Sequence, residues 1–420
     1  MSPYLEKNAW FPAQIIGAPH PDLGMVVVIP AYLEPDLLDS LSAILACVPP
    51  KAAVEVIVVI NDGERDEGLV KKQNEESYQA ACAWGRQHSS ARLKFHFLYH
   101  SNLPAKHAGV GLARKIGMDE AVYRLLQAQR DQGIICCFDA DASCDPSYLR
   151  AIERTFVNQP RLQAASIYFE HPLTGTAFPE KVYEAIAQYE LHLRYYVQAQ
   201  RWSGFPFAQQ TIGSSMAVRC TAYQQQGGMN KRKAGEDFYF LQKFIPLGHF
   251  TEINTTRVIP SPRISNRVPF GTGKAIGQLI QDGIPLTTYA PRSFKDLQVF
   301  FAMVPQFFSA QKNKWSTLQQ SLPASIKRFL ELADFENKLT EIRQHTSSKS
   351  TFEQRFYRWF NAFTLMKFMH FSRDNFYDNV PIEMAAHWLL KEKKVRRIAE
   401  LKTARELLAV YRRMDRKRKN

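Results

Sequence analysis

The stretch IICCFDAD, residues 134–141, joins a short apolar run directly to two carboxylates that stand one residue apart. A continuous apolar run of this length predicts a strand buried on both faces, as in the middle of a parallel sheet. Asp139 and Asp141 then lie where the strand ends. Two carboxylates in that position can share Mg²⁺ or Mn²⁺, because both ions take oxygen ligands. The alternative is an acidic turn in which Asp141 and Asp145 cap a helix that begins near Pro146.

Three similar apolar runs precede this strand, at residues 25–30, 54–60 and 93–99. Patterns typical of helices follow the first run, at residues 34–47, and the third, at residues 106–130. This alternation predicts an α/β fold with a Rossmann-like, mostly parallel sheet and helices on both sides. Ligands bind such sheets beyond the carboxyl ends of the strands, so we expect the polar residues that follow the strands to converge there.

The alternating pattern continues as far as about Pro260. Further strands are predicted at residues 162–170 and 212–219, and further helices at residues 179–200 and 236–244.

The change of composition beyond that point predicts three regions. An α/β domain would occupy residues 1–260, with its core at 25–260. Residues 261–292 are rich in proline and glycine and are predicted to form an irregular connector. Residues 293–420 are predicted to form a helical C-terminal region with a basic tail.

The overall composition is that of an ordinary globular protein, with 45% hydrophobic and 22% charged residues in a chain of 420. No run reaches the roughly 20 apolar residues that cross a bilayer. The first ten residues include Glu6 and Lys7 and lack the apolar core of a signal peptide. None of the six cysteines forms a C-x-x-C pair, which favours free thiols over disulfides or zinc. These features predict a cytoplasmic protein.

The net charge of +14 could indicate a nucleic-acid partner, so its location matters. Residues 391–420 hold 13 Lys and Arg against 4 Asp and Glu, and most of the excess charge is therefore in one predicted helical tail. The rest of the chain lacks the aromatic and basic face of a nucleic-acid-binding protein, so we expect no nucleic-acid partner. The tail is predicted to be a solvated basic helix. The alternative is peripheral contact with an anionic membrane surface or an acidic polymer.

Polar residues also follow the first two predicted strands. The first strand ends in PAYLE, residues 30–34, and the second in NDGE, residues 61–64. Side chains at neighbouring strand ends can hydrogen-bond a base and its ribose. Each motif also has a structural alternative, because Glu34 suits the first turn of a helix and Asn-Asp-Gly is a common turn.

Taken together, these motifs resemble those of the GT-A nucleotide-sugar transferases, particularly glycosyltransferase family 2. The resemblance covers residues 25–260. It rests on landmarks that recur in order: VIPAYLE at 28–34, NDGE at 61–64, Asn102 with Lys106 and ARKIG at 113–117, Asp139 with Asp141, GSSMAVR at 213–219 and GED at 235–237. Two landmarks depart from the family's pattern, with Leu33 in place of the more usual Asn and Asn61 in place of Asp. The family's common Q-x-x-R-W motif is missing.

The resemblance implies a soluble, metal-dependent glycosyltransferase of the hexosyltransferase type, with a GT-A catalytic domain at residues 1–260. Such an enzyme would move a sugar from a nucleotide diphosphate sugar to an unidentified hydroxyl acceptor: a glycan, a lipid-linked molecule or a small molecule. Asp237 would be the general base, next to Glu236. Inversion is then expected, because the base faces the acceptor hydroxyl opposite the leaving diphosphate. The structural alternative for Glu236 and Asp237 is helix capping.

The resemblance also implies a nucleotide-sugar site with Mn²⁺ or Mg²⁺ as cofactor. Asp141 would be the principal metal ligand, and Asp139 would lie near the ribose and the metal. The residues expected to bind the nucleotide sugar are Pro30, Tyr32, Glu34, Asn61, Asp62, Lys106, Arg114, Asp139, Ala140, Asp141, Arg263 and Arg267. Arg257, Arg263 and Arg267 are candidates to meet the diphosphate or an anionic acceptor. The alternative is a surface loop of solvated arginines.

Two other functions stay open at this point. A phosphatase could use Asp139 as its nucleophile, although there the motif normally follows the first strand of the domain and here it follows the fourth. A GT-A-like fold could also serve as a catalytically inactive binding protein. The presence of Asp139, Asp141 and Asp237 argues against that second alternative.

Overall fold

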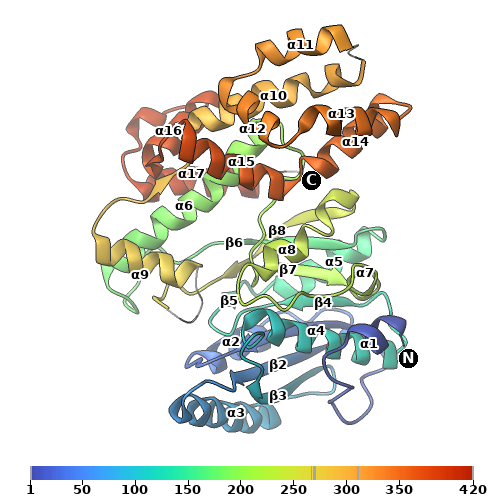
Figure 1. Ribbon diagram of the computed structural model, residues 1–420. Helices are drawn as coiled ribbons and strands as arrows, with labels where there is room; N and C mark the ends of the chain where they lie inside the picture. Colours follow the sequence, from blue (N-terminus) through green and yellow to red (C-terminus); the bar gives the residue numbers. More distant parts are fainter. Residues whose placement is uncertain (1, 266, 268–270, 310–311, 419–420) are drawn as a thin grey trace. The chain divides into compact units, whose positions relative to one another are not determined.

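The computed structural model describes residues 2–265, 267, 271–309 and 312–418 (Figure 1). The chain divides into two compact units. The sheet unit comprises Met1–Tyr183, Thr211–Gln278 and Arg413–Asn420, and the helical unit comprises Glu184–Gln210 and Leu279–Arg412. All of the predicted site residues belong to the sheet unit.

Among the described residues, the sheet unit contains one eight-stranded sheet in the order β3-β2-β1-β4-β7-β6-β8-β5. The bounds are β1 Leu23–Ala31, β2 Ala53–Gly63, β3 Leu93–Leu103, β4 Ile134–Cys137, β5 Ser143–Cys144, β6 Ala164–Phe169, β7 Met216–Arg219 and β8 Phe250–Ile259. Strands β3, β2, β1 and β4 run parallel, as do β6 and β8. Strand β7 runs antiparallel to both neighbours, and β5 to β8. The predicted α/β fold class is confirmed in its architecture: a Rossmann-like, mostly parallel sheet with flanking helices and a helical C-terminal region.

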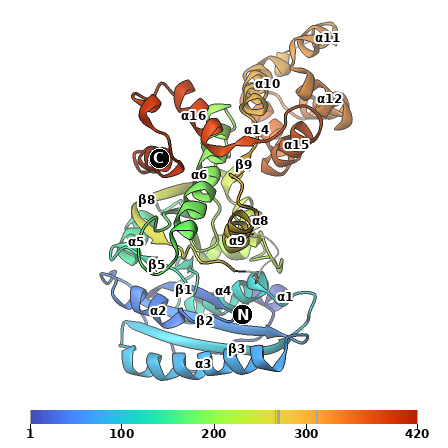
Figure 2. The same cartoon turned by 90° about the vertical axis from the view of Figure 1, so that its left-hand side faces the viewer.

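The central strands are apolar because helices cover them. Every residue of β2 is buried, as are most residues of β1. Helix α4 (Val110–Gln127) packs on β1 and β2, and helix α3 (Gly68–His88) packs on β3 and β2, as Figure 2 shows for α3. The close approach of α4 depends on Gly117, since a Cβ there would overlap Val28 and lie 3.0 Å from Val59.

The remaining helices of the sheet unit are α1 Pro3–Asn8, α2 Leu37–Leu45, α5 Tyr148–Asn158, α7 Cys220–Gln225, α8 Glu236–Leu241 and most of α9 Thr272–Asp282, with a 3₁₀ turn at Ile245–Leu247. Helix α4 begins four residues later than predicted, because the chain first makes a turn in which the His107 N–H donates to the Pro104 carbonyl at 2.8 Å. Residues 261–292 were predicted to be irregular, yet they contain α9. Its glycines obscured a helical pattern that buries Ile276.

The helical unit is built around aromatic side chains. Its helices are most of α6 Glu180–Trp202, α10 Pro291–Ser309, α11 Lys312–Ser321, α12 Ala324–Leu332, α13 Phe335–Gln344, α14 Lys349–Trp359, α15 Ala362–Asn375, α16 Ile382–Glu392 and most of α17 Ala404–Arg416. Phe300 is fully buried, with its ring centroid 5.3 Å from that of Phe360 and 5.9 Å from that of Phe307. In the described part of the chain, no helix is long and apolar enough to span a membrane.

Basic residues near the C-terminus have acidic partners in the sheet unit. Arg416 lies 3.2 Å from Glu170, and Arg418 lies 2.8 Å from Glu252, each from nitrogen to carboxylate oxygen. These two arginines are therefore not the freely solvated charges that we predicted for the tail. Peripheral membrane contact through the tail stays a prediction.

Candidate active site

The carboxyl ends of β1, β2 and β4 lie side by side. The strand register pairs Ala31 with Ile60 and Val28 with Cys137. The Phe138 N–H donates to the Val28 carbonyl at 3.0 Å, which continues the β1–β4 alignment to the residue before the D-x-D motif. The motifs that follow these three strands therefore meet at one edge of the sheet, where ligands bind in this class of fold.

Arg114 of α4 bridges two carboxylates that are far apart in the sequence. Its Nη2 donates to Asp139 Oδ1, and its Nη1 donates to Glu236 Oε1. The Arg114 and Glu236 side chains are each 4% exposed, whereas that of Asp139 is 36% exposed. Burial opposes the positive charge, but Asp139 and Glu236 outweigh it and raise the pKa of Arg114. The D-x-D motif and the Glu-Asp pair thus lie within the span of one guanidinium.

Asp237 lies in the first turn of α8 and is half-buried. Gly235 precedes the helix with φ +70°, a conformation that favours glycine. The Phe238 N–H donates to Asp237 Oδ1 at 2.7 Å. Burial and the neighbouring Glu236 raise the pKa of Asp237 to about 7, while Arg114 acts in the opposite direction. This carboxylate can therefore gain and lose a proton near neutral pH, as a general base does.

A second cluster joins the end of β1 to the D-x-D motif. Arg263 binds both oxygens of Glu34, and its Nη2 lies 3.0 Å from Asp141 Oδ2. Arg267 Nη1 lies 2.9 Å from Glu34 Oε2 and donates to the Tyr32 carbonyl at 2.6 Å. Burial raises the pKa of Glu34 even though Arg263 lowers it. The arginines are thus not the solvated residues of a surface loop.

Asp139 and Asp141 have the donor chemistry of a Mg²⁺ or Mn²⁺ site. Asp139 binds Arg114 through Oδ1 and Asp141 contacts Arg263 through Oδ2, so each carboxylate has a second oxygen to offer. Burial and the adjacent Asp139 raise the pKa of Asp141 to about 7, while Arg263 acts in the opposite direction. Within the described ranges, no group of three or more His, Cys, Asp or Glu could hold a metal alone. The pair fits a cation whose other ligands are substrate phosphates and water.

Arg257 lies apart from this cluster. It binds Asp145 at 3.0 Å and Glu170 at 2.9 Å, which leaves it paired rather than available to a diphosphate. Asp145 therefore does not cap the helix that follows. The N-cap of α5 is Ser147, so the capping interpretation of the acidic turn is wrong for Asp145.

Asp62, at the end of β2, is fully buried. It accepts hydrogen bonds from the Tyr99 hydroxyl at 2.9 Å and from the Asn102 N–H at 2.9 Å. Asn102, the last but one residue of β3, has φ +59°, and the bond from its N–H to Asp62 supports that left-handed conformation. In this structure the carboxylate holds the end of β3.

The other predicted nucleotide-binding residues lie around the same strand ends. Pro30 is the last but one residue of β1, and Ala140 is buried between the two aspartates. Burial and Asp66 raise the pKa of Tyr32 to about 12, so its phenol stays protonated. Lys106 is exposed on the loop before α4 and makes no ion pair with another described residue. The Lys106 side chain is therefore not part of either carboxylate cluster.

Asn74 is a buried residue of this site that the sequence motifs did not indicate. Its side chain accepts from the Leu33 N–H at 2.8 Å and donates to the Asn61 carbonyl at 3.1 Å. It thereby ties the end of β1 to the end of β2. Leu33 has φ +49°, a left-handed conformation that is unfavourable for leucine, and the bond from its N–H supports it. An isolated asparagine in the polar helix α3 gave no signal of this contact in the sequence.

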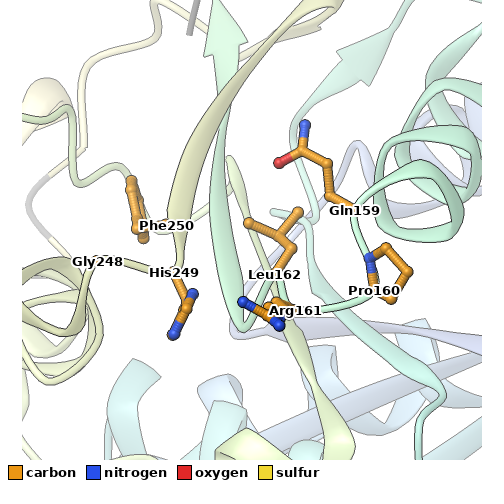
Figure 3. Close-up of a pocket in the computed structure, with 7 residues that line it drawn as sticks. All are labelled: Gln159, Pro160, Arg161, Leu162, Gly248, His249 and Phe250. Carbon is orange, nitrogen blue, oxygen red and sulfur yellow. The ribbon is translucent and has the colours of Figure 1, made fainter.

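A hollow of about 400 Å³ lies elsewhere on the sheet unit (Figure 3). Its lining is Gln159, Pro160, Arg161, Leu162, Gly248, His249 and Phe250. These residues precede or begin strands β6 and β8, so the hollow lies at their amino ends. It is therefore distinct from the site formed after β1, β2 and β4.

Comparisons with known protein families and with curated protein sequences find no match. Among solved structures, residues 1–349 of S. aureus TarS in complex with UDP-GlcNAc are similar at 14% identity over 93% of this chain and 92% of that chain, with a TM-score of 0.37. The complex of the same fragment with UDP aligns with 81% of this chain and 92% of that chain, at 14% identity and a TM-score of 0.34. These TM-scores do not establish a common fold. The fold class rests instead on the sheet topology.

Proposed function

We propose that this protein is a metal-dependent glycosyltransferase that moves a sugar, with inversion, from a nucleotide diphosphate sugar to a hydroxyl acceptor. The observation that carries the proposal is the buried cluster in which Arg114 joins Asp139 to Glu236. Because of this cluster, the acidic D-x-D motif and the candidate base Asp237 share one edge of the sheet. A phosphatase that uses Asp139 as its nucleophile would not need the separate base on α8, whereas an inverting transferase needs a base for the acceptor hydroxyl.

The diphosphate would bind next to Asp141, where Arg263 and Arg267 lie. Guanidinium groups suit phosphate oxygens, because they present several donors in one plane. Arg263 Nε is buried and has no hydrogen-bond partner among the described residues, so a donor remains for a phosphate oxygen. Glu34 holds both arginines in place by ion pairs.

Asp141 and Asp139 would hold the metal ion through their remaining carboxylate oxygens. Mn²⁺ or Mg²⁺ bound there supplies the positive charge that stabilises the diphosphate as a leaving group. The raised pKa of Asp141 is consistent with this assignment, since a bound cation would offset the repulsion between Asp141 and Asp139.

Asp237 would accept the proton of the acceptor hydroxyl. The hydroxyl oxygen forms a bond to the anomeric carbon of the sugar as the bond between that carbon and the diphosphate oxygen breaks. The proton ends on the Asp237 carboxylate and the bonding electrons on the diphosphate. A base with a pKa near neutral pH is deprotonated in about half of the molecules at that pH and is basic enough to take this proton.

The test is release of a nucleoside diphosphate from UDP-, GDP-, ADP- and dTDP-sugars, with Mn²⁺ or EDTA and a set of hydroxyl acceptors. The proposal predicts metal-dependent release of one nucleotide, lost in Asp141→Ala and Asp237→Asn. Binding of a nucleotide without turnover would instead support an inactive binding protein. A phosphatase would instead show metal-dependent hydrolysis of a phosphate monoester. Asp139→Asn would abolish that hydrolysis, and Asp237→Asn would leave it unchanged.

A further inference from the structure

Four sequence motifs meet at the guanidinium group of Arg114. It contacts Asp139 at the end of β4 and Glu236 at the start of α8. On its third side lies Gly213, in the turn before β7, where a Cβ would lie 2.6 Å from both terminal nitrogens of Arg114. The arginine is therefore enclosed by two carboxylates and a glycine from three separate parts of the chain.

We infer that Arg114 is a positioning residue that fixes the donor-side carboxylate Asp139 and the candidate base Asp237 relative to each other. This inference rests on the proposed function. A contact with the nucleotide, which the family resemblance implied, does not fit its surroundings. The side chain is 4% exposed, and both terminal nitrogens already donate to carboxylates, which leaves only the buried Nε without a partner among the described residues. Arg114 acts on the substrate only through the two acidic residues.

The position of Asp237 follows from that of Glu236. The two are consecutive in the first turn of α8, so an ion pair that fixes Glu236 also fixes where the helix begins. The Asn230 side chain holds the same turn by donating to the Glu236 carbonyl at 3.0 Å. At the other end of the guanidinium, the ion pair orients Asp139 and leaves it partly exposed toward the site.

The charges that act on Asp237 come from three elements. Glu236 is its neighbour on α8, Arg114 comes from α4 and Asp139 from the end of β4. The two carboxylates raise the pKa of Asp237, and Arg114 lowers it. Removing the Arg114 charge should therefore raise the pH at which the base becomes active, and removing the Glu236 charge should lower that pH.

The geometry also requires arginine rather than lysine. A guanidinium fork can bind two carboxylates on different sides, whereas an ammonium group is a point charge on a shorter stem. Arg114→Lys keeps the charge but cannot keep both contacts. This variant should lose turnover while the pH midpoint stays close to that of the wild type.

The experiment is the pH dependence of kcat/KM for the nucleotide sugar that the wild type turns over, followed by nucleotide release. The variants are Arg114→Met, Arg114→Lys and Glu236→Gln, with Arg86→Met on the exposed face of α3 as the matched control. The acid midpoint is the pH at which kcat/KM reaches half of its maximum on the acid side. Arg114→Met should raise this pH by about one unit or more, because losing a nearby positive charge raises the pKa of a carboxylate. Glu236→Gln should lower it. Nucleotide affinity and melting temperature, measured alongside, report whether each variant is folded.

An unmoved midpoint in folded Arg114→Met and Glu236→Gln would overturn the inference, because a merely structural arginine lowers activity without changing the pKa of the base. If Arg114→Met does not fold, Glu236→Gln decides by the direction of its shift. The proposed function fails separately. The proposed function is wrong if the wild type turns over no nucleotide sugar. It is also wrong if Asp237→Asn keeps full activity and the same fall of kcat/KM at low pH.

Discussion

Arg263 Nη2 lies 3.0 Å from Asp141 Oδ2, and the same guanidinium binds Glu34, so one side chain joins the end of β1 to the D-x-D motif. Asp141 is 21% exposed and Arg263 15%, which places the contact at the rim of the site. The residues that would meet the metal and the diphosphate are therefore already in contact.

Arg263→Met should weaken binding of the nucleoside diphosphate by about 10- to 100-fold, since a hydrogen bond to a charged group contributes about 1.5–3 kcal/mol. Isothermal titration with the nucleotide and Mn²⁺ measures the effect. Arg257→Met is the matched control, because Arg257 is already paired with Asp145 and Glu170. Equal losses of affinity in both variants would show that Arg263 has no specific role.

Asp237→Asn should reduce transfer by about 10²- to 10⁴-fold, the usual contribution of a general base. Nucleotide affinity should be unchanged, because in the described part of the chain the Asp237 carboxylate accepts from the Phe238 N–H and forms no ion pair with Arg263 or Arg267. Asp39→Asn on the exposed face of α2 is the control for loss of a carboxylate. Loss of nucleotide binding in Asp237→Asn, or full activity, would exclude Asp237 as the base.

The rate should depend on pH through the same carboxylate. Burial and Glu236 raise the pKa of Asp237 to about 7, and only the deprotonated form can accept a proton. In the wild type, kcat/KM should therefore fall about tenfold per unit as the pH drops below about 7. A profile that stays flat down to the ordinary pKa of an aspartate would contradict this assignment.

Asn74→Ala should destabilise the strand ends that carry the site. The substitution leaves the Leu33 N–H and the Asn61 carbonyl without their partner, and each buried unsatisfied group costs about 1–3 kcal/mol. The melting temperature and the nucleotide affinity should both fall. Gln73→Ala, on the exposed face of the same helix, should change neither. An unchanged melting temperature in Asn74→Ala would show that the contact contributes little.

The strands were predictable because they are continuous apolar runs, and their carboxyl ends could be placed together by the rules of parallel sheets. Helix α9 was harder to predict from the sequence, because its glycines weaken the helical pattern. The start of α4 depends on a turn at Pro104, which the periodicity of the apolar residues does not report.

Contacts between distant residues limited the prediction of the site. Arg257, Arg263 and Arg267 look alike in the sequence, yet the first pairs with Asp145 and the other two with Glu34. The pairing of Arg114 with Glu236 spans 122 residues and follows from the tertiary fold alone. A sequence motif gives the type of side chain, whereas its partner depends on which elements the fold brings together.

The most direct test of the central claim is a thermal-shift measurement of the full chain with UDP, GDP, CDP, ADP and dTDP, each with Mn²⁺, Mg²⁺ or EDTA. A ligand that binds only the native state raises the free energy of unfolding, by about 2.7 kcal/mol at a hundredfold excess over Kd. The melting temperature rises as a result. We predict a rise with one nucleotide that requires the metal and is lost in Asp141→Ala but kept in Asp39→Ala. No rise with any nucleotide, or the same rise in EDTA, would contradict a metal-dependent nucleotide-sugar site at Asp139 and Asp141.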